Sequence, residues 1–216
     1  MNFKGLFIGI DRYASPMVGD LTCSARDARA LYALFVDTLG GDASVLVTDE
    51  DATRHRILTE LDNLKTAAPD DVVYIHFSGH GSDTHHLVTH DCDPLTLDSS
   101  CVLLEDLVDK FAEIPARNVI LCLDCCFSGG AGARVFHAPV ASRAPASPEA
   151  LLQQIGGTGR VILTASAADQ EAIEDRRKGH GIFSYYLMQA LMGAPEVLDA
   201  GTVPFLALAH FVTTIS

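Results

Sequence analysis

Short apolar runs alternate with segments of helical periodicity along most of this chain of 216 residues. Apolar runs that end in small or polar residues are typical of strands buried on both faces of a parallel sheet. Parallel strands need long crossovers, and helices usually supply them. We therefore expect strands at residues 3–11, 44–48, 71–77, 118–124 and 160–166.

The segments between these strands carry apolar residues three or four positions apart, as amphipathic helices do. We expect helices at residues 24–39, 54–64, 103–111, 182–193 and 203–212. Ser24 with Asp27 resembles a capping box for the first helix, and Thr53 or Asp51 is the expected cap of the second. The predicted fold class is α/β: a three-layer sandwich with a mostly parallel central sheet of about six strands, flanked by helices.

One well-buried domain is the expected organisation, because 216 residues with 48% hydrophobic content are too few for two ordinary domains. We assign residues 1–216 to it, with a mobile loop at about 131–159 that is rich in Ala, Pro, Ser and Gly. The sequence leaves open that this domain is one part of a longer polypeptide.

The charge balance argues against two classes of partner. With 15 Lys and Arg against 28 Asp and Glu, the net charge of -13 disfavours nucleic acid and anionic membranes. We find no apolar run of membrane-spanning length and no signal peptide at the start, so we expect a cytoplasmic protein. The six cysteines are then expected to be thiols.

Two loops stand out because each follows a predicted strand and carries reactive side chains. The sequence SGHGS follows the strand at 71–77 and contains His80, whereas the pair Cys125 and Cys126 follows the strand at 118–124. If these strands are neighbours in a parallel sheet, both loops emerge at its carboxyl edge, where ligands usually bind. A histidine can take the proton of a nearby thiol and leave a nucleophilic thiolate.

The glycines of both loops suggest a second role for the backbone. They allow a substrate chain to approach closely, and the N–H groups of Gly81 and Cys126 could bind a developing oxyanion. No side chain is identified that would orient His80, so a backbone carbonyl is the candidate for that role. The pattern alone predicts a cysteine nucleophile with a histidine base.

At these loops the sequence resembles the caspase-hemoglobinase fold, and specifically the metacaspase and bacterial caspase-like branch of cysteine peptidases. The motifs are YIHFSGHGS at 74–82 and LDCCFSGG at 123–130, with 46 positions from His80 to Cys126. Caspases have a similar spacing but Gln-Ala-Cys before the nucleophile, where this chain has Asp-Cys-Cys. Weaker matches at 5–13, 21–28, 162–174 and 179–191 extend the resemblance over nearly the whole chain.

The resemblance implies a caspase-like cysteine endopeptidase in which Cys126 is the nucleophile and His80 its base. It also implies that Asp124, Asp27 and Ser78 line the pocket for the residue before the scissile bond. Paired carboxylates favour a guanidinium or an ammonium group, so the expected substrate is a protein or peptide cleaved after Arg or Lys. Cys125 is expected to have a supporting or neutral role.

Members of this family are often zymogens, which raises the question of activation. Arg134 and Arg143 lie in the expected mobile loop and are candidate self-cleavage sites. An activating or effector protein in a bacterial stress or defence pathway is a further expectation by analogy. No cofactor is required; calcium stays open, because Asp91, Asp93 and Asp98 offer oxygen ligands while the family's calcium-site acids do not align clearly here.

Two other classes of function remain as alternatives. Histidines and a cysteine within a short segment could bind zinc, although their spacing matches no compact zinc motif; they are His80, His85, His86, His90 and Cys92. The other alternative is a catalytically silent caspase fold that only binds partners, since a fold does not guarantee activity. Most free cysteines are simply buried small hydrophobes, and Cys122, inside a predicted strand, fits that description.

Overall fold

The computed structural model describes residues 2–41, 43–125, 159–165, 174–175 (backbone only), 178–196, 198–199, 207 and 211. The loop expected to be mobile at about 131–159 lies outside these ranges except for Gly159. Most of the helix expected at 203–212 also lies outside them.

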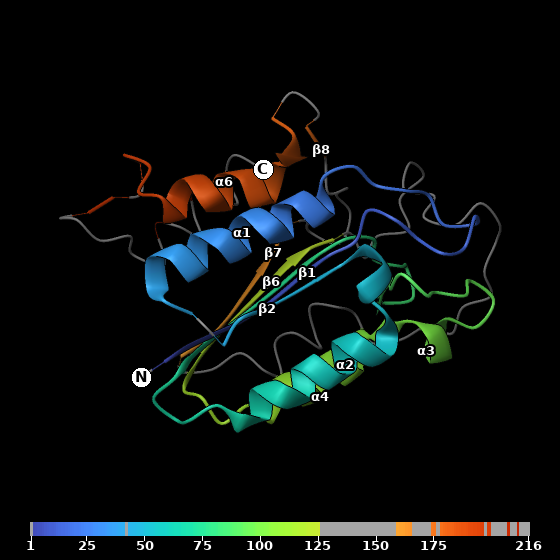
Figure 1. Cartoon of the computed structure of the whole chain (residues 1–216), viewed down its shortest axis with the longest axis horizontal. Coiled ribbons are helices and arrows are strands. Elements are labelled where there is room, and N and C mark those ends of the chain that lie inside the picture. The colour runs from blue at the N-terminus through green and yellow to red at the C-terminus, as the bar shows by residue number, and fades with distance from the viewer. Residues whose placement is uncertain are drawn as a thin grey trace.

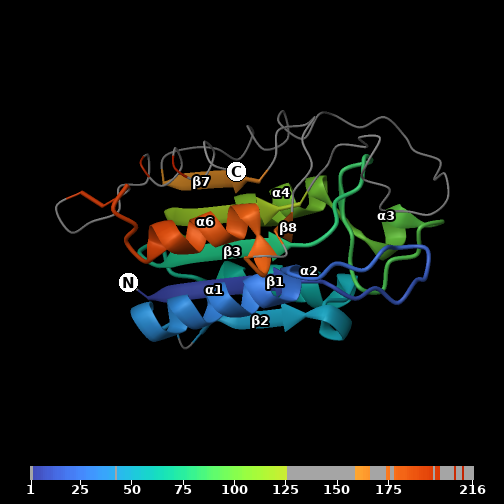
Figure 2. The same cartoon turned by 90° about the horizontal axis from the view of Figure 1, so that it is seen from above.

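A parallel sheet forms the centre of the molecule (Figure 1). Its strands are β1 (Phe3–Gly9), β2 (Val45–Thr48), β3 (Val72–Ser78), β6 (Asn118–Asp124) and β7 (Arg160–Thr164). Their spatial order is β2-β1-β3-β6-β7, and each neighbouring pair is parallel. Figure 2 shows β2 and β7 at opposite edges. The expected α/β class is therefore confirmed, with five strands described in the sheet rather than about six.

Helices cover both faces of this sheet (Figure 1). The longer ones are α1 (Ser24–Leu39), α2 (Arg54–Asn63), α4 (Leu104–Ala112) and α6 (Ile182–Leu191), and the short ones are α3 (Leu97–Ser100) and the 3₁₀ turns η1 (Asp49–Asp51) and η2 (Leu64–Thr66). Helices α1 and α6 lie on one face, and α2 and α4 lie on the other. This arrangement is the predicted three-layer sandwich.

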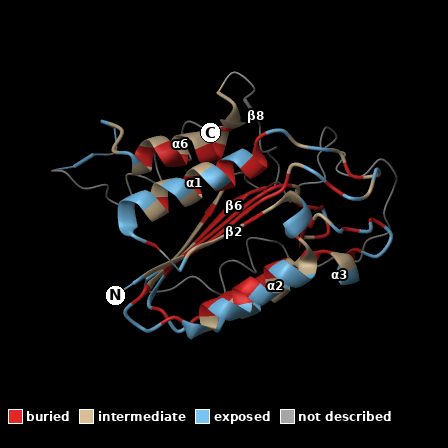
Figure 3. Ribbon diagram, viewed as in Figure 1, coloured by how far each residue is buried: buried red, intermediate tan, exposed pale blue. Residues whose placement is uncertain are grey.

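The alternation of side chains along each strand builds two separate cores, one on each face of the sheet. Ile75 and Phe77 of β3 pack in the core under α2 and α4, whereas Tyr74 packs in the core under α1 and α6. Both faces of the central strands are thus buried, as Figure 3 shows. Continuous apolar runs in the sequence are the direct result, because neither face of these strands meets water.

One of the expected helix caps is present in the structure and the other is not. Thr53 caps α2, since its Oγ1 accepts the backbone N–H of Arg56 at 3.2 Å. The capping box expected at Ser24 and Asp27 is wrong: the residue before α1 is Cys23, with no side-chain cap bond. The carboxylate of Asp27 instead contacts His180 and Gly181, far along the chain.

The segment expected to be a polar loop up to residue 101 contains more structure than predicted. A small antiparallel pair forms from β4 (His86–Leu87) and β5 (Val102–Leu103), with α3 between them in the sequence.

A second small antiparallel pair lies later in the chain and consists of β8 (Glu174–Asp175) and β9 (His180–Gly181). Strands of two residues carry no readable alternation, so sequence periodicity does not reveal them.

Candidate active site

The two loops singled out in the sequence do follow neighbouring strands. Strands β3 and β6 are parallel and in register, with Ser78 opposite Asp124. The contact continues one step beyond the strands, where the Gly79 N–H donates to the Asp124 carbonyl at 3.3 Å. Residues 80 and 125 therefore leave the same carboxyl edge of the sheet, which is where open parallel sheets place their ligands.

His80 is held by contacts from the segment that follows β1. Its backbone N–H donates to the hydroxyl of Tyr13 at 3.0 Å, and the two rings lie with centroids 5.2 Å apart. The ring Nε2 of His80 lies 2.8 Å from the carbonyl oxygen of Gly19. A carbonyl oxygen only accepts hydrogen bonds, so Nε2 carries a proton and Nδ1 is the ring nitrogen that can take one.

Gly81 lies in a bridge that leaves its own N–H out of the pairing. Gly81 and Leu87 form an isolated antiparallel bridge. Its hydrogen bonds run from Val88 N–H to the His80 carbonyl and from Ser82 N–H to the His86 carbonyl, both at 2.9 Å. The bridge thus fixes the backbone at Gly81 without using the N–H group that was expected to bind an oxyanion.

The carboxylates of Asp27 and Asp124 converge on one point of the backbone. A Cβ atom added to Gly181 would lie 3.0 Å from Oδ2 of Asp124 and 3.1 Å from Oδ2 of Asp27. Asp27 comes from the first turn of α1 and is 0% exposed, whereas Asp124 ends β6 and is 6% exposed. Two acidic side chains from distant parts of the sequence are therefore brought to one small, largely dehydrated space.

Hydrogen bonds hold both carboxylates in place. Oδ2 of Asp27 accepts the Gly181 N–H at 2.9 Å, and Oδ1 of Asp27 is in close contact with Nδ1 of His180. The hydroxyl of Ser184, in the first turn of α6, donates to Oδ2 of Asp124 at 2.5 Å. Donors to a buried carboxylate are required to offset the cost of removing it from water.

Ser78, the third residue expected in this pocket, is 3% exposed and lies beside Asp124 in the register of the sheet. Sequence reasoning did not single out His180 or Ser184. The only signal was the stretch GHGIFS, in which polar residues precede and enter an apolar helix.

Cys126, Arg134 and Arg143 lie outside the described residues. Cys125 is described and is 2% exposed in the core under α2 and α4. This position on the opposite face from Asp124 agrees with a packing role for Cys125. Cys122 is also buried, within β6, as the sequence indicated.

The residues of the zinc alternative do not converge. His86 contacts Thr84 and Asp98, and His90 contacts the carbonyl of Arg12 at 2.7 Å, while Cys92 contacts Cys101. Within the described ranges, no group of three or more His, Cys, Asp or Glu side chains is placed to hold a metal ion. The structure therefore offers no described arrangement to support the zinc alternative.

The three acids considered for calcium serve separate hydrogen bonds. Asp91 accepts from Thr89 and from the backbone of Arg54, and Asp93 accepts from the backbone of Leu95 and the hydroxyl of Thr96. Asp98 contacts His86. Among the residues that the structure describes, these acids are not part of a group placed to hold a metal ion.

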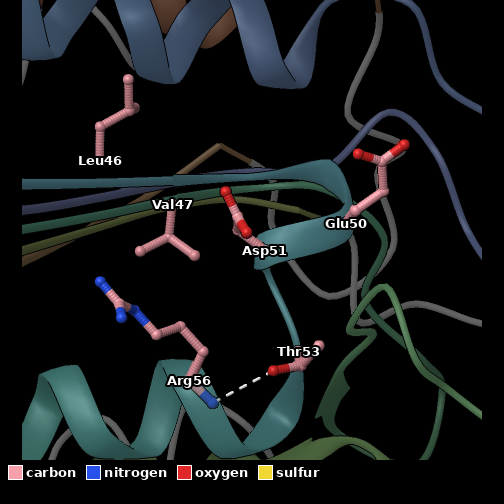
Figure 4. A pocket seen from close by; sticks show the side chains of 6 residues that line it. All are labelled: Leu46, Val47, Glu50, Asp51, Thr53 and Arg56. Atoms are coloured by element: carbon pink, nitrogen blue, oxygen red, sulfur yellow. Dashed lines mark hydrogen bonds between the residues drawn. The ribbon is translucent and has the colours of Figure 1, made fainter.

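A separate hollow lies at the β2 edge of the sheet (Figure 4). Its volume is about 370 Å³, and its lining comprises Leu46, Val47, Glu50, Asp51, Thr53 and Arg56. Acidic, basic and apolar side chains are mixed there, and none of the predicted site residues lines it. We therefore do not assign the peptidase site to this hollow.

A parallel sheet between two helical layers, with a histidine loop at its carboxyl edge and two buried carboxylates that meet there, is typical of caspase-like proteins. The family model for the caspase domain matches residues 3–203. The chain belongs to this family, which is one of cysteine peptidases. No helix within the described ranges is long and apolar enough to cross a membrane.

Curated relatives agree with this assignment. Metacaspase-2 and metacaspase-3 of Trypanosoma brucei brucei are each 28% identical over 145 residues, covering 58% of this chain. The match spans 41% and 40% of those proteins, so this chain corresponds to about two fifths of their length.

Caspase-1 of Spodoptera frugiperda is similar in fold, with a TM-score of 0.63 at 14% identity over 98% of this chain and 76% of that one. Protein GSU0716 of Geobacter sulfurreducens gives a TM-score of 0.61 at 15% identity, over 89% of this chain and 82% of that one. At these identities the two structures support the fold alone.

Proposed function

We propose that this chain is a cysteine endopeptidase that cleaves peptide bonds after Arg, and less readily after Lys, with Cys126 as nucleophile and His80 as base. The observation that carries the specificity is the convergence of Asp27 and Asp124 on Gly181. Two dehydrated carboxylates favour a planar guanidinium, which can donate to both at once, over the compact ammonium of Lys.

The reaction follows from the roles of the two side chains. Nδ1 of His80 takes the proton of the Cys126 thiol, and the thiolate attacks the scissile carbonyl carbon. The N–H groups of Gly81 and Cys126 bind the oxyanion that develops on the carbonyl oxygen. His80 then donates its proton to the leaving amine, so the C–N bond breaks and a thioester forms.

Water completes the cycle. His80 takes a proton from the attacking water, whose oxygen adds to the thioester carbonyl, and the C–S bond breaks to release the carboxylic acid. The hydrogen bond between Nε2 of His80 and the Gly19 carbonyl supports this account, because it keeps the ring in one orientation and one tautomer through both halves.

Latency and cleavage at Arg134 or Arg143 are part of the same proposal, since both are basic residues of the kind the pocket would accept. A protein substrate, an activating or effector protein and a cytoplasmic location remain expectations. A calcium requirement is left to experiment.

The direct test is cleavage of fluorogenic peptides ending in Arg, Lys, Asp or Leu by the wild-type chain and by Cys126→Ala, with and without calcium. We expect cleavage after Arg and Lys that disappears in the variant. Cleavage that survives in Cys126→Ala would refute the nucleophile. If a correctly folded wild type cuts no peptide, even after limited proteolysis in the loop that contains Arg134 and Arg143, the chain acts as a silent binding module.

A further inference from the structure

Two cysteines that the proposed reaction does not use lie against each other in the segment between β4 and β5. The Sγ atoms of Cys92 and Cys101 are 2.7 Å apart. Non-bonded heavy atoms usually pack at about 3.5–4 Å, and a disulfide bond is about 2.05 Å long. Both cysteines are free, and their sulfurs are therefore closer than ordinary packing gives without being bonded.

The backbone around the pair is fixed on both sides. The Cys92 N–H donates to the Thr89 carbonyl at 3.1 Å, and the Cys101 N–H donates to the Leu97 carbonyl at 2.8 Å. Asp93 and Ser100, which adjoin the two cysteines, are also hydrogen-bonded to each other. Ser100 Oγ accepts the Asp93 N–H at 2.9 Å and donates to the Asp93 carbonyl at 3.0 Å. A bond between the sulfurs would thus need little movement of the chain.

Outside contacts also hold this segment against the body of the protein. Nε of Arg54 donates to the Cys101 carbonyl at 2.8 Å.

A hydrogen bond shared with Cys92 lowers the pKa of Cys101, which favours a thiolate at that position. A thiolate next to a second thiol is the arrangement that condenses to a disulfide on oxidation.

We propose that Cys92 and Cys101 are a redox modification site that forms a reversible disulfide when an oxidant as small as hydrogen peroxide reaches these two buried residues, which are 2% and 0% exposed. The Cys101 thiolate attacks one peroxide oxygen, the O–O bond breaks, and a sulfenic acid and water form once a proton is taken up. The Cys92 sulfur then attacks the sulfenic sulfur and water leaves. In total, two thiols are oxidised to one disulfide and one hydrogen peroxide is reduced to two waters.

The bond would restrain the surroundings of His80. The segment between β4 and β5, which contains both cysteines, is joined to the His80 loop by the hydrogen bond from Val88 N–H to the His80 carbonyl, at 2.9 Å. It is also joined to the stretch that bears Tyr13, because Ala14 N–H donates to the His90 carbonyl at 2.9 Å. Oxidation should therefore stabilise the fold near the histidine, without any role for Cys126.

The experiment uses the full chain with Cys126→Ala, so that peroxide cannot react at position 126. After treatment with hydrogen peroxide, remaining thiols are alkylated and the protein is cleaved before aspartates, which separates Cys92 from Cys101 at Asp93 and Asp98. We expect linked peptides that contain the two cysteines and that separate after reduction with dithiothreitol. Recovery of both cysteines as alkylated thiols, or as higher oxides without a link, would overturn the proposal.

Thermal unfolding gives a second readout. A disulfide that closes the loop from Cys92 to Cys101 should raise the Tm of the oxidised protein by roughly 5–10 °C. Cys23→Ala, a variant at another buried cysteine, should keep the rise, whereas Cys101→Ser should lose it. A rise that is equal in Cys101→Ser would also contradict the site. Neither readout depends on peptidase activity, so the site can fail or succeed separately from the proposed function.

Discussion

Nε2 of His80 lies 2.8 Å from the carbonyl oxygen of Gly19, and this contact fixes which ring nitrogen carries the proton. The carbonyl belongs to the segment between β1 and α1, so the orientation of the proposed base depends on a part of the chain 61 positions away. No acidic third member of a triad is needed to orient the ring, because a carbonyl oxygen selects the tautomer just as well.

Tyr13 supports His80 from the same segment and gives the first prediction. Its hydroxyl accepts the His80 N–H at 3.0 Å and lies 3.3 Å from the Ile10 carbonyl. Tyr13→Phe should lower kcat about tenfold with little change in KM, because it loosens the base without touching the acidic pocket. Steady-state kinetics with an Arg peptide checks this.

Tyr32→Phe, at a half-buried ring on α1, is the matched control and should leave kcat unchanged. If Tyr13→Phe keeps wild-type kcat, or if only KM rises, the hydroxyl does not act through His80. In Tyr13→Phe the His80 N–H loses its acceptor, and an unsatisfied N–H in a half-buried loop costs stability. The free energy of unfolding of this variant should therefore be about 1 kcal/mol lower than that of wild type.

Gly181 gives the second prediction, because its missing side chain leaves room where the two carboxylates meet. In Gly181→Ala the new Cβ would lie 3.0 Å from Asp124 and 3.1 Å from Asp27, so at least one carboxylate must shift. We expect kcat/KM for an Arg peptide to fall by about tenfold or more, since small displacements in a binding site are costly. Unchanged kcat/KM would show that a substrate does not approach the carboxylates at this point.

His76 predicts a pH dependence of stability. Its ring is fully buried in β3, and no hydrogen-bond partner for either nitrogen lies in the part of the chain that the structure describes. Burial lowers the pKa of His76 from 6.5 to about 3. Between these values the unfolded chain binds more protons than the folded one, so stability falls as the pH drops below 6.5.

The measurement is urea unfolding of wild type and His76→Leu between pH 7.5 and pH 4.5. The stability of wild type should fall relative to the variant by at most about 1.4 kcal/mol per pH unit below pH 6.5, and the two should run parallel above it. His55→Gln, at an exposed histidine, should behave like wild type. Parallel curves for wild type and His76→Leu throughout the acid range would contradict a neutral buried histidine.

The sequence predicted the central strands well because their signal is local. β6 spans Asn118–Asp124 as expected, since both of its faces are buried and its last four residues are all buried. The strand expected at residues 3–11 ends earlier, at Gly9, because only the paired part of an apolar run is a strand. The short strands β4 and β5 were missed since their pairing joins residues 15 and 17 positions apart and does not depend on a local pattern.

The candidate site, like the fold, has parts that the sequence predicts and parts that it does not. His80 follows a strand and Asp124 ends one, so their position at the sheet edge could be predicted from the order of the elements. Asp27 resembled a capping residue, yet its partners His180 and Gly181 are 153 and 154 positions away. The stretch GHGIFS is only a weak local signal for His180 and Ser184, because what defines them is the buried carboxylate that each contacts.

The central claim is that Asp27 and Asp124 together select a basic side chain, and specificity measured on carboxylate variants tests it most directly. We would compare kcat/KM for Arg, Lys and Leu peptides in wild type, Asp27→Asn and Asp124→Asn, with Asp37→Asn as control, because Asp37 lies exposed on the same helix as Asp27. Each charged hydrogen bond contributes about 1.5–3 kcal/mol, so each pocket variant should lose roughly ten- to a hundredfold on Arg.

Cleavage of the Arg peptide should fall far more than any residual cleavage after Leu, and Asp37→Asn should match wild type. Folded Asp27→Asn and Asp124→Asn proteins that keep the wild-type preference for Arg would contradict the account, and the acidic pair would then be a structural feature of the fold alone.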